Sequence, residues 1–118
     1  MHVFKNKAFA KWAAHEGLPD KALLDAVEEM SRGLVDADLG GQLFKKRVAL
    51  DGRGKRGGAR TLLAFRSDDK AFFIYGFTKN ARANIDEREL KALQLYAKTL
   101  LNLSKSDLDK AVRAGELI

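Results

Sequence analysis

The chain has 118 residues, of which 46% are hydrophobic and 32% charged, with one proline and no cysteine. This composition is typical of a globular domain, and the lack of cysteine excludes disulfide scaffolds and thiolate metal sites. No apolar run reaches the roughly 18 residues of a membrane helix. We therefore expect one domain over residues 1–118, in the cytoplasm and without a membrane span.

The positive charge of the sequence is concentrated in one segment. The 22 Lys and Arg residues outnumber the 16 Asp and Glu residues, giving a net charge of +6. The segment from Gln42 to Arg66 carries +7 and the rest of the chain −1, because eight basic residues there face a single acid, Asp51. The eight are Lys45, Lys46, Arg47, Arg53, Lys55, Arg56, Arg60 and Arg66. Such a region favours an anionic partner: nucleic acid, an acidic protein or membrane phosphates.

The N-terminal third predicts a short edge strand followed by two helices. Residues 2–4 suit an edge strand, and Asn6 can cap a helix over residues 7–16 that stops at Gly17. Apolar residues then recur at helical spacing over residues 20–32. A glycine-containing loop follows.

The middle of the chain changes to an extended pattern. We expect strands over residues 43–50, 59–66 and 71–77, the last two joined as a hairpin through turn formers at 67–69. The continuous apolar run over residues 72–75 suits a central strand that is buried on both faces. In the strand before it, alternation places Arg60 on the same face as Leu62 and Arg66.

The C-terminal third returns to helix. Asp86 and Glu89 form a capping-box start for a helix over residues 86–102, and Ser104 with Asp107 begins a last short helix. The predicted fold class is α+β, in the order β-α-α-β-β-β-α-α. Its mainly antiparallel sheet of three to four strands packs with the N-terminal helices and a C-terminal helix.

The glycine-rich stretch from Gly52 to Gly57 matches G-x-G-x-x-G but does not indicate a dinucleotide site. That motif needs a preceding strand and a following helix, whereas here a strand follows. Two interpretations stay open. The stretch is either a flexible hairpin loop or a mobile basic loop in which Arg53, Lys55 and Arg56 grip phosphates.

Other functional patterns are sparse. The two histidines, His2 and His15, have no partner at ligand spacing, so we expect no metal, no cofactor and no catalytic histidine. The strand aromatics include Tyr75 and Phe77, which lie near the strand end, where they could stack on bases. Phe72 and Phe73 are better explained as core residues.

The stretch over residues 43–85 resembles the RelE-type toxins of toxin–antitoxin modules, most of all their HigB-related branch. A K-R-V-A strand at 46–49, a G-R-G-K-R-G-G-A-R loop at 52–60 and an F-T-K-N turn at 77–80 occur in the order found in that branch. The resemblance implies a small α/β sandwich whose sheet carries the active surface. It also implies an endoribonuclease that cuts mRNA in the ribosomal A site and is neutralised by an antitoxin.

The resemblance also suggests which residues act. Arg60 matches the arginine that follows the basic loop, and Lys79 and Arg82 match basic positions in the turn after the last strand. The better-known RelE pattern has a second arginine where this chain has Asn80, and a tyrosine near Asp86. We expect catalysis to involve Arg60, Lys55, Lys79 and Arg82. The expected RNA contacts are Lys46, Arg47, Arg53, Arg56, Tyr75, Phe77 and Asn80.

RNA can be cut without a metal because its 2′-OH is an internal nucleophile, so positioning and charge stabilisation can supply most of the catalysis. Arginine suits the phosphate, since its planar fork is bidentate and always charged. Lys55 and Lys79 are both candidates for the proton-transfer base. Arg60 could instead only pair with a surface carboxylate.

Two other functions stay open. The same fold hosts ParE-type toxins, so a non-catalytic inhibitor of DNA gyrase is one, and an RNA-binding module without toxicity is the other. The expected partners are the ribosome, mRNA and a cognate antitoxin. We expect that antitoxin to be encoded nearby, with a helix-turn-helix motif as one possibility.

Overall fold

The computed structural model describes residues 1–50, 54–67 and 69–118, with residues 54–57 described by their backbone. These residues form nine elements: β1 (His2–Lys5), α1 (Lys7–Glu16), α2 (Asp20–Ser31), β2 (Ala37–Asp38), β3 (Leu43–Leu50), β4 (Gly54–Arg66), β5 (Lys70–Thr78), α3 (Glu87–Leu101) and α4 (Lys105–Arg113). The predicted helices and the three long strands are confirmed, and so is the α+β fold class.

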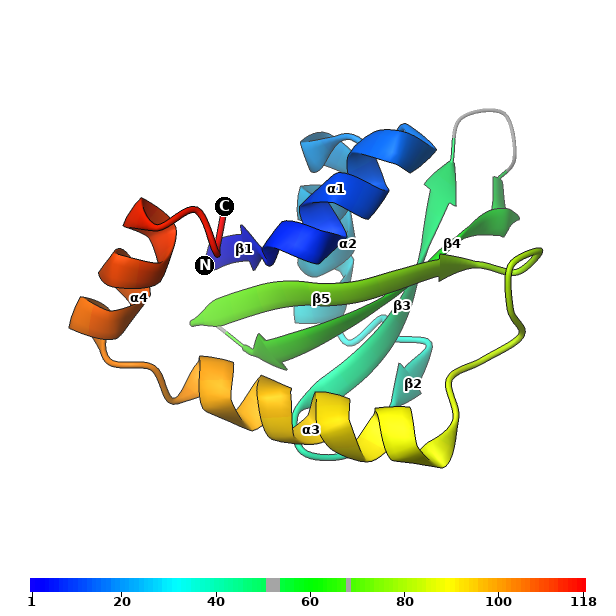
Figure 1. Ribbon diagram of the computed structural model, residues 1–118. Coiled ribbons are helices and arrows are strands. Elements are labelled where there is room, and N and C mark those ends of the chain that lie inside the picture. The colour runs from blue at the N-terminus through cyan, green and yellow to red at the C-terminus, as the bar shows by residue number, and fades with distance from the viewer. Residues whose placement is uncertain (51–53, 68) are drawn as a thin grey trace.

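The strands form one mixed sheet in the order β1-β5-β4-β3-β2 (Figure 1). β1 runs parallel to β5, and every other neighbouring pair is antiparallel. β5 therefore lies inside the sheet with neighbours on both sides. This position explains the continuous apolar run that follows Ala71, because both faces of β5 are covered by helices.

Two details of the sheet differ from the sequence prediction. The described sheet has five strands rather than three to four, because Ala37 and Asp38 pair with Lys45 and Phe44 of β3 where a loop was expected. β4 also begins at Gly54, five residues earlier than predicted, because Gly54 pairs with Leu50 across the hairpin. Both differences come from pairing between strands rather than from a local pattern.

The helix ends follow the predicted caps. The Asn6 side chain accepts a hydrogen bond from the Phe9 amide at 2.7 Å, and Gly17 ends α1 with φ of 72°. At the start of α3, Asp86 and Glu89 form a complete capping box. Because these signals act over three or four residues, they hold whatever the tertiary packing.

Each face of the sheet carries its own hydrophobic core. On one face α1 and α2 pack against residues such as Leu63 and Phe73. On the other face α3 and α4 cover residues such as Leu62 and Phe72. Figure 1 shows α1 and α2 on one side of the sheet and α3 on the opposite side, which we call the α3 face.

A β-bulge in β5 changes which side chains reach the α3 face. Leu62 pairs with Tyr75 but Leu63 pairs with Phe73, so Ile74 is an extra residue in β5. Beyond the bulge, Tyr75 joins the core on the α3 face. Simple alternation from Phe73 would have sent it to the opposite face.

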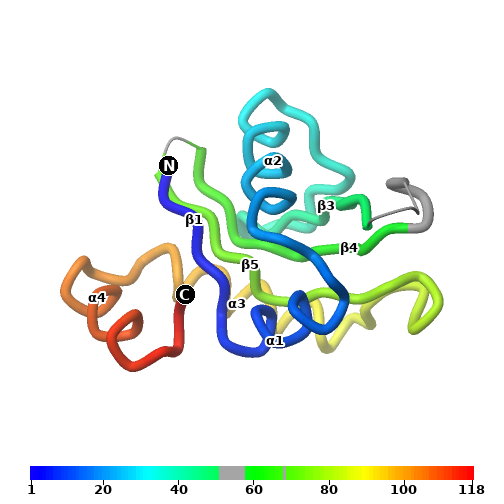
Figure 2. Tube along the Cα trace, turned by 90° about the horizontal axis from the view of Figure 1, so that it is seen from above, coloured from blue at the N-terminus to red at the C-terminus, as the bar shows by residue number. Residues whose placement is uncertain are grey.

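The two ends of the described chain meet beside β1. Lys5 exchanges two backbone hydrogen bonds with Ile118, at 3.0 and 2.9 Å, and the Lys7 amide donates to Glu116 at 3.1 Å. Figure 2 shows the C-terminal residues lying between β1 and α4. Residues 116–118 thereby extend the sheet beyond β1.

Candidate functional site: an arginine-rich sheet face

A row of three side chains crosses the α3 face near the end where β5 terminates. Arg60 in β4 lies directly opposite Arg47 in β3 and Phe77 in β5. Arg60 is two residues before Leu62, which packs under α3, so the alternation of the strand places Arg60 on that face. The predicted face of Arg60 is confirmed.

Arg60 is a buried cation that lacks a full set of partners. Its side chain belongs to a residue that is only 9% exposed, and its Nη1 finds no hydrogen-bond acceptor within the described residues. The expected alternative, a pairing of Arg60 with a surface carboxylate, is not present in that part of the chain. A buried donor without an acceptor costs about 1–3 kcal/mol, and a like charge directly opposite on the next strand adds to this. The surroundings of Arg60 therefore favour an incoming anion.

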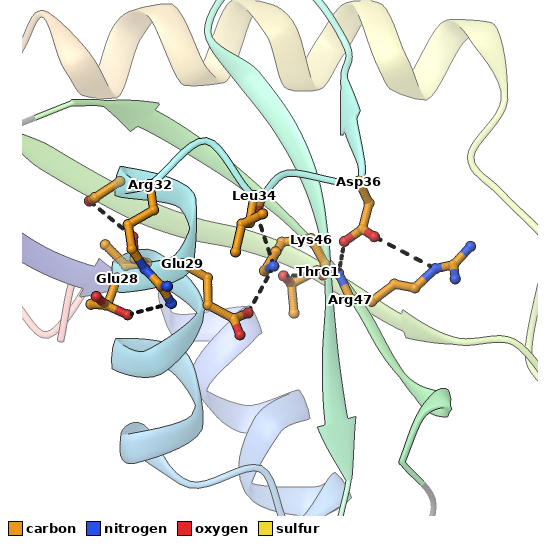
Figure 3. A network of polar contacts seen from close by, with 10 residues as sticks. Glu28, Glu29, Arg32, Leu34, Asp36, Lys46, Arg47 and Thr61 are labelled. Atoms are coloured by element: carbon orange, nitrogen blue, oxygen red, sulfur yellow. Dashed lines mark hydrogen bonds and ion pairs between the residues drawn. The ribbon is translucent and has the colours of Figure 1, made fainter.

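Arg47 is held at the neighbouring strand by one carboxylate. The Asp36 side chain accepts a hydrogen bond from the Arg47 backbone amide at 2.5 Å, and its other oxygen lies 4.0 Å from Arg47 Nε. Figure 3 shows the Arg47 side chain extending past Asp36, with the end of the guanidinium beyond the contact. The side chain is 46% exposed, so it can meet a ligand that approaches Arg60.

Arg82, in the loop after β5, is bound much more completely. Its Nη1 and Nη2 form a two-pronged ion pair with the Glu89 carboxylate, at 2.8 and 2.5 Å. Its Nη1 also donates to the Tyr75 hydroxyl at 3.0 Å, and its Nε donates to the Asn84 carbonyl at 2.9 Å. The guanidinium carbon lies 6.0 Å from the centre of the Phe77 ring. Arg82 is thus fixed above the residue that neighbours Arg60.

The ion pair shifts the titration of both groups. The hydrogen bonds from Arg82 lower the pKa of Glu89 to about 2, with a further contribution from the Asp86 backbone amide. The hydrogen bond to Glu89 likewise raises the pKa of Arg82 above its ordinary value. Both groups therefore stay charged throughout the physiological pH range.

The two aromatic residues on β5 serve the site differently from the predicted base stacking. Phe77 is only 3% exposed, and its ring centre lies 5.9 Å from that of half-buried Tyr75. In this arrangement the Phe77 ring has no free face to offer a base. Tyr75 instead contributes a hydroxyl oxygen that accepts the hydrogen bond from Arg82.

Lys46 lies away from this group, on the opposite face of the sheet. Its Nζ binds the Glu29 carboxylate and the Leu34 carbonyl, each at 2.9 Å, and its side chain is 6% exposed (Figure 3). Its carbonyl accepts a hydrogen bond from the Thr61 hydroxyl at 2.8 Å. These contacts join α2 to β3, so the structure does not bring Lys46 to the arginine row, although an RNA contact was predicted for it.

The remaining predicted site residues fall into two groups. Lys79 and Asn80 are exposed at the turn that directly follows β5. Arg53 lies outside the described residues, and for Lys55 and Arg56 the description extends only to the backbone of β4. The structure thus brings together Arg47, Arg60, Tyr75, Phe77 and Arg82 of the predicted set.

Neither a metal centre nor a membrane span is found in the described ranges. Those residues contain no group of three or more His, Asp or Glu side chains placed to hold a metal ion. Within the same ranges, every helix is too short or too polar to cross a bilayer.

The comparison with protein families gives the chain its place. The family described as the RelE toxin of the RelE/RelB toxin–antitoxin system matches residues 1–118. The chain belongs to the RelE toxin family. A search of curated proteins finds no match to it. The RelE resemblance expected from residues 43–85 is confirmed, and the family makes this chain the toxin of a toxin–antitoxin system with a cognate RelB-type antitoxin as partner.

Two residues of this RelE toxin's site, Asp36 and Glu89, were not predicted as part of it. Asp36 precedes a strand of two residues that no local pattern marks. Glu89 is recognisable as a helix cap, but nothing in its seven-residue distance from Arg82 indicates an ion pair. A search for carboxylates near the cationic motif would have found Glu89 as a candidate without assigning its partner.

Proposed function

We propose that this RelE toxin is a metal-independent endoribonuclease that cuts mRNA on the ribosome, as expected from the HigB-related motifs. The observation that carries the proposal is the buried, incompletely bonded Arg60 with Arg47 directly opposite. Each outer arginine of the site has a carboxylate of its own, Asp36 or Glu89. Arg60 has none among the described residues, which makes it the guanidinium most ready to bind a phosphate.

The proposed chemistry needs four tasks. The 2′-OH must be aligned with the scissile phosphate and lose its proton, while the phosphate gains charge and the 5′-oxygen gains a proton. Arg60 stabilises the charged phosphate, and Arg47 adds a second positive charge from the neighbouring strand. The base is Lys55 or Lys79, of which Lys79 is exposed at the end of β5. Arg82 adds a fixed charge beside Phe77.

The antitoxin is proposed to neutralise the toxin by covering this cationic face. A partner that docks there should present acidic side chains, because Arg47 and Arg60 lie opposite each other without a described carboxylate between them. A helix-turn-helix protein encoded beside the toxin would fit this role. The predicted cytoplasmic location follows from the same function, since ribosomes and mRNA are there.

Inducible expression followed by mapping of mRNA 5′ ends tests the proposal. We expect codon-phased cuts with the wild-type toxin, loss of those cuts and of growth arrest with Arg60→Ala, and partial recovery with Arg60→Lys. Arg113→Ala is the matched control, because it removes an exposed arginine of α4. Intact mRNA together with DNA damage would instead indicate gyrase poisoning. Parental cutting by Arg60→Ala would remove Arg60 from the mechanism.

A further inference from the structure

Glu89 is the residue to which most of the described contacts around Arg82 lead. A guanidinium has five N–H donors. In the described contacts, four of those of Arg82 are used: two by the Glu89 carboxylate, one by Tyr75 and one by Asn84. Arg82 therefore has little freedom to rotate, and its position depends on Glu89.

The same carboxylate is anchored to the start of α3. Glu89 Oε1 accepts a hydrogen bond from the Asp86 backbone amide at 3.0 Å, and the Glu89 amide donates to Asp86 at 2.8 Å. The end of the loop after β5 and the first turn of α3 thus form one rigid unit around Glu89. This unit sets where the Arg82 charge lies above Phe77, the strand neighbour of Arg60.

We propose that Glu89 is a positioning residue of the RNA site: it acts through Arg82, fixing the Arg82 charge and the Tyr75 hydroxyl beside Arg60. The proposal rests on the proposed nuclease function. Because Arg82 donates to the Tyr75 oxygen, the phenolic hydrogen is directed elsewhere and stays available to a substrate oxygen. Positioning of this kind lowers the barrier without adding affinity for the ground state.

A merely structural role for Glu89, as a helix cap, predicts a different outcome. Glutamine serves the capping box as well as glutamate does, since its side-chain oxygen can accept from the same backbone amide. Glu89→Gln therefore keeps the start of α3 but loses the charge and one acceptor of the two-pronged pair. Glu87→Gln is the matched control, because Glu87 lies in the same first turn and contacts only Lys91, at 3.8 Å, among the described residues.

Cleavage of mRNA in programmed ribosomes separates these roles. We expect Glu89→Gln to lower kcat about tenfold with KM changed less than about twofold, and Glu87→Gln to behave as wild type. In an Arg82→Ala background, Glu89→Gln should have no further effect, because the two residues act as one unit. Parental kcat in Glu89→Gln, or an equal loss in both backgrounds, would overturn the proposal.

A second measurement does not depend on nuclease activity. In the wild type, the Nε–H of Arg82 should exchange slowly in nitrogen-15 NMR spectra, because it is bonded to the Asn84 carbonyl at 2.9 Å. This protection should be lost in Glu89→Gln and kept in Glu87→Gln. If the wild type left mRNA intact, the nuclease proposal would fail, and exchange would decide by itself whether Glu89 holds Arg82. Unchanged protection in Glu89→Gln would refute that hold.

Discussion

Replacing Arg60 with methionine is expected to move stability and activity in opposite directions. Methionine has a similar length, so it retains most of the packing of the buried stem. It removes the charge opposite Arg47 and the Nη1 donor that has no acceptor in the described residues. The substitution thus removes two unfavourable features of the native state together with the proposed phosphate ligand.

The magnitude follows from those two features. An unsatisfied buried donor costs about 1–3 kcal/mol, and a directly opposed like charge about 0.2–1 kcal/mol. Some of this cost is recovered by the residual exposure of Arg60, which is 9%. We therefore expect Arg60→Met to raise the free energy of unfolding by about 1 kcal/mol, which corresponds to roughly 4 °C in Tm for a chain of this size. The cleavage rate should fall by about 10²–10³.

Urea denaturation of the purified toxin measures the first effect, and mRNA cleavage in programmed ribosomes measures the second. Arg66→Met is the matched control from the same strand and the same face. Arg66 is well bonded, because its Nη1 donates to the Leu101 carbonyl at 3.1 Å and lies 3.6 Å from the Asp69 carboxylate. Its removal should lower the free energy of unfolding by about 1 kcal/mol. If Arg60→Met lost as much stability as Arg66→Met, the reasoning from the unused donor would be refuted.

Four further outcomes are expected. The ion pair that lowers the pKa of Glu89 from 4.5 to about 2 stabilises the fold fully above pH 4.5 and is lost toward pH 2, so the stability difference between wild type and Glu89→Gln should shrink over that range in stepwise urea titrations. A Cβ at Gly76 would overlap the Trp12 ring, so Gly76→Ala should lower the free energy of unfolding by about 1–3 kcal/mol and alter tryptophan fluorescence; a wild-type midpoint would contradict this. Lys46→Met should cost about 2 kcal/mol, less than a fully buried pair because the Glu29 side chain is 26% exposed, and leave RNA affinity unchanged in filter binding. RNA affinity should fall with salt with a log–log slope of about −3 if four cations meet phosphates, and a flat dependence would exclude a polyanion at this face.

The sequence predicts those parts of the fold that depend on neighbouring residues. The cap at Asn6, the stop at Gly17 and the capping box at Glu89 each rest on one turn of chain, and each is confirmed. The start of β4 at Gly54 rests on a cross-strand partner instead, and glycine in a basic stretch carries no local strand signal. Only the partner strand decides that boundary.

The site was predictable to the same extent. Alternation along β4 is enough to place Arg60 on the correct face, because no bulge interrupts that strand between Arg60 and Leu62. Neither its burial nor its unused donor follows from the sequence, since both depend on what packs around it. The bulge at Ile74 also hides the face of Tyr75, because one extra residue reverses the alternation that follows.

The position of β1 has a consequence for the order in which the toxin folds. β1 is synthesised first, yet the two segments that flank it, β5 and residues 116–118, come much later in the chain. The β3–β4–β5 meander, in contrast, joins strands that are neighbours in sequence and has a small loop-closure cost. The meander that carries Arg47, Arg60 and Phe77 can therefore form before β1 is in place. A chain emerging from the ribosome would assemble its cationic face while its own first strand still awaits a partner.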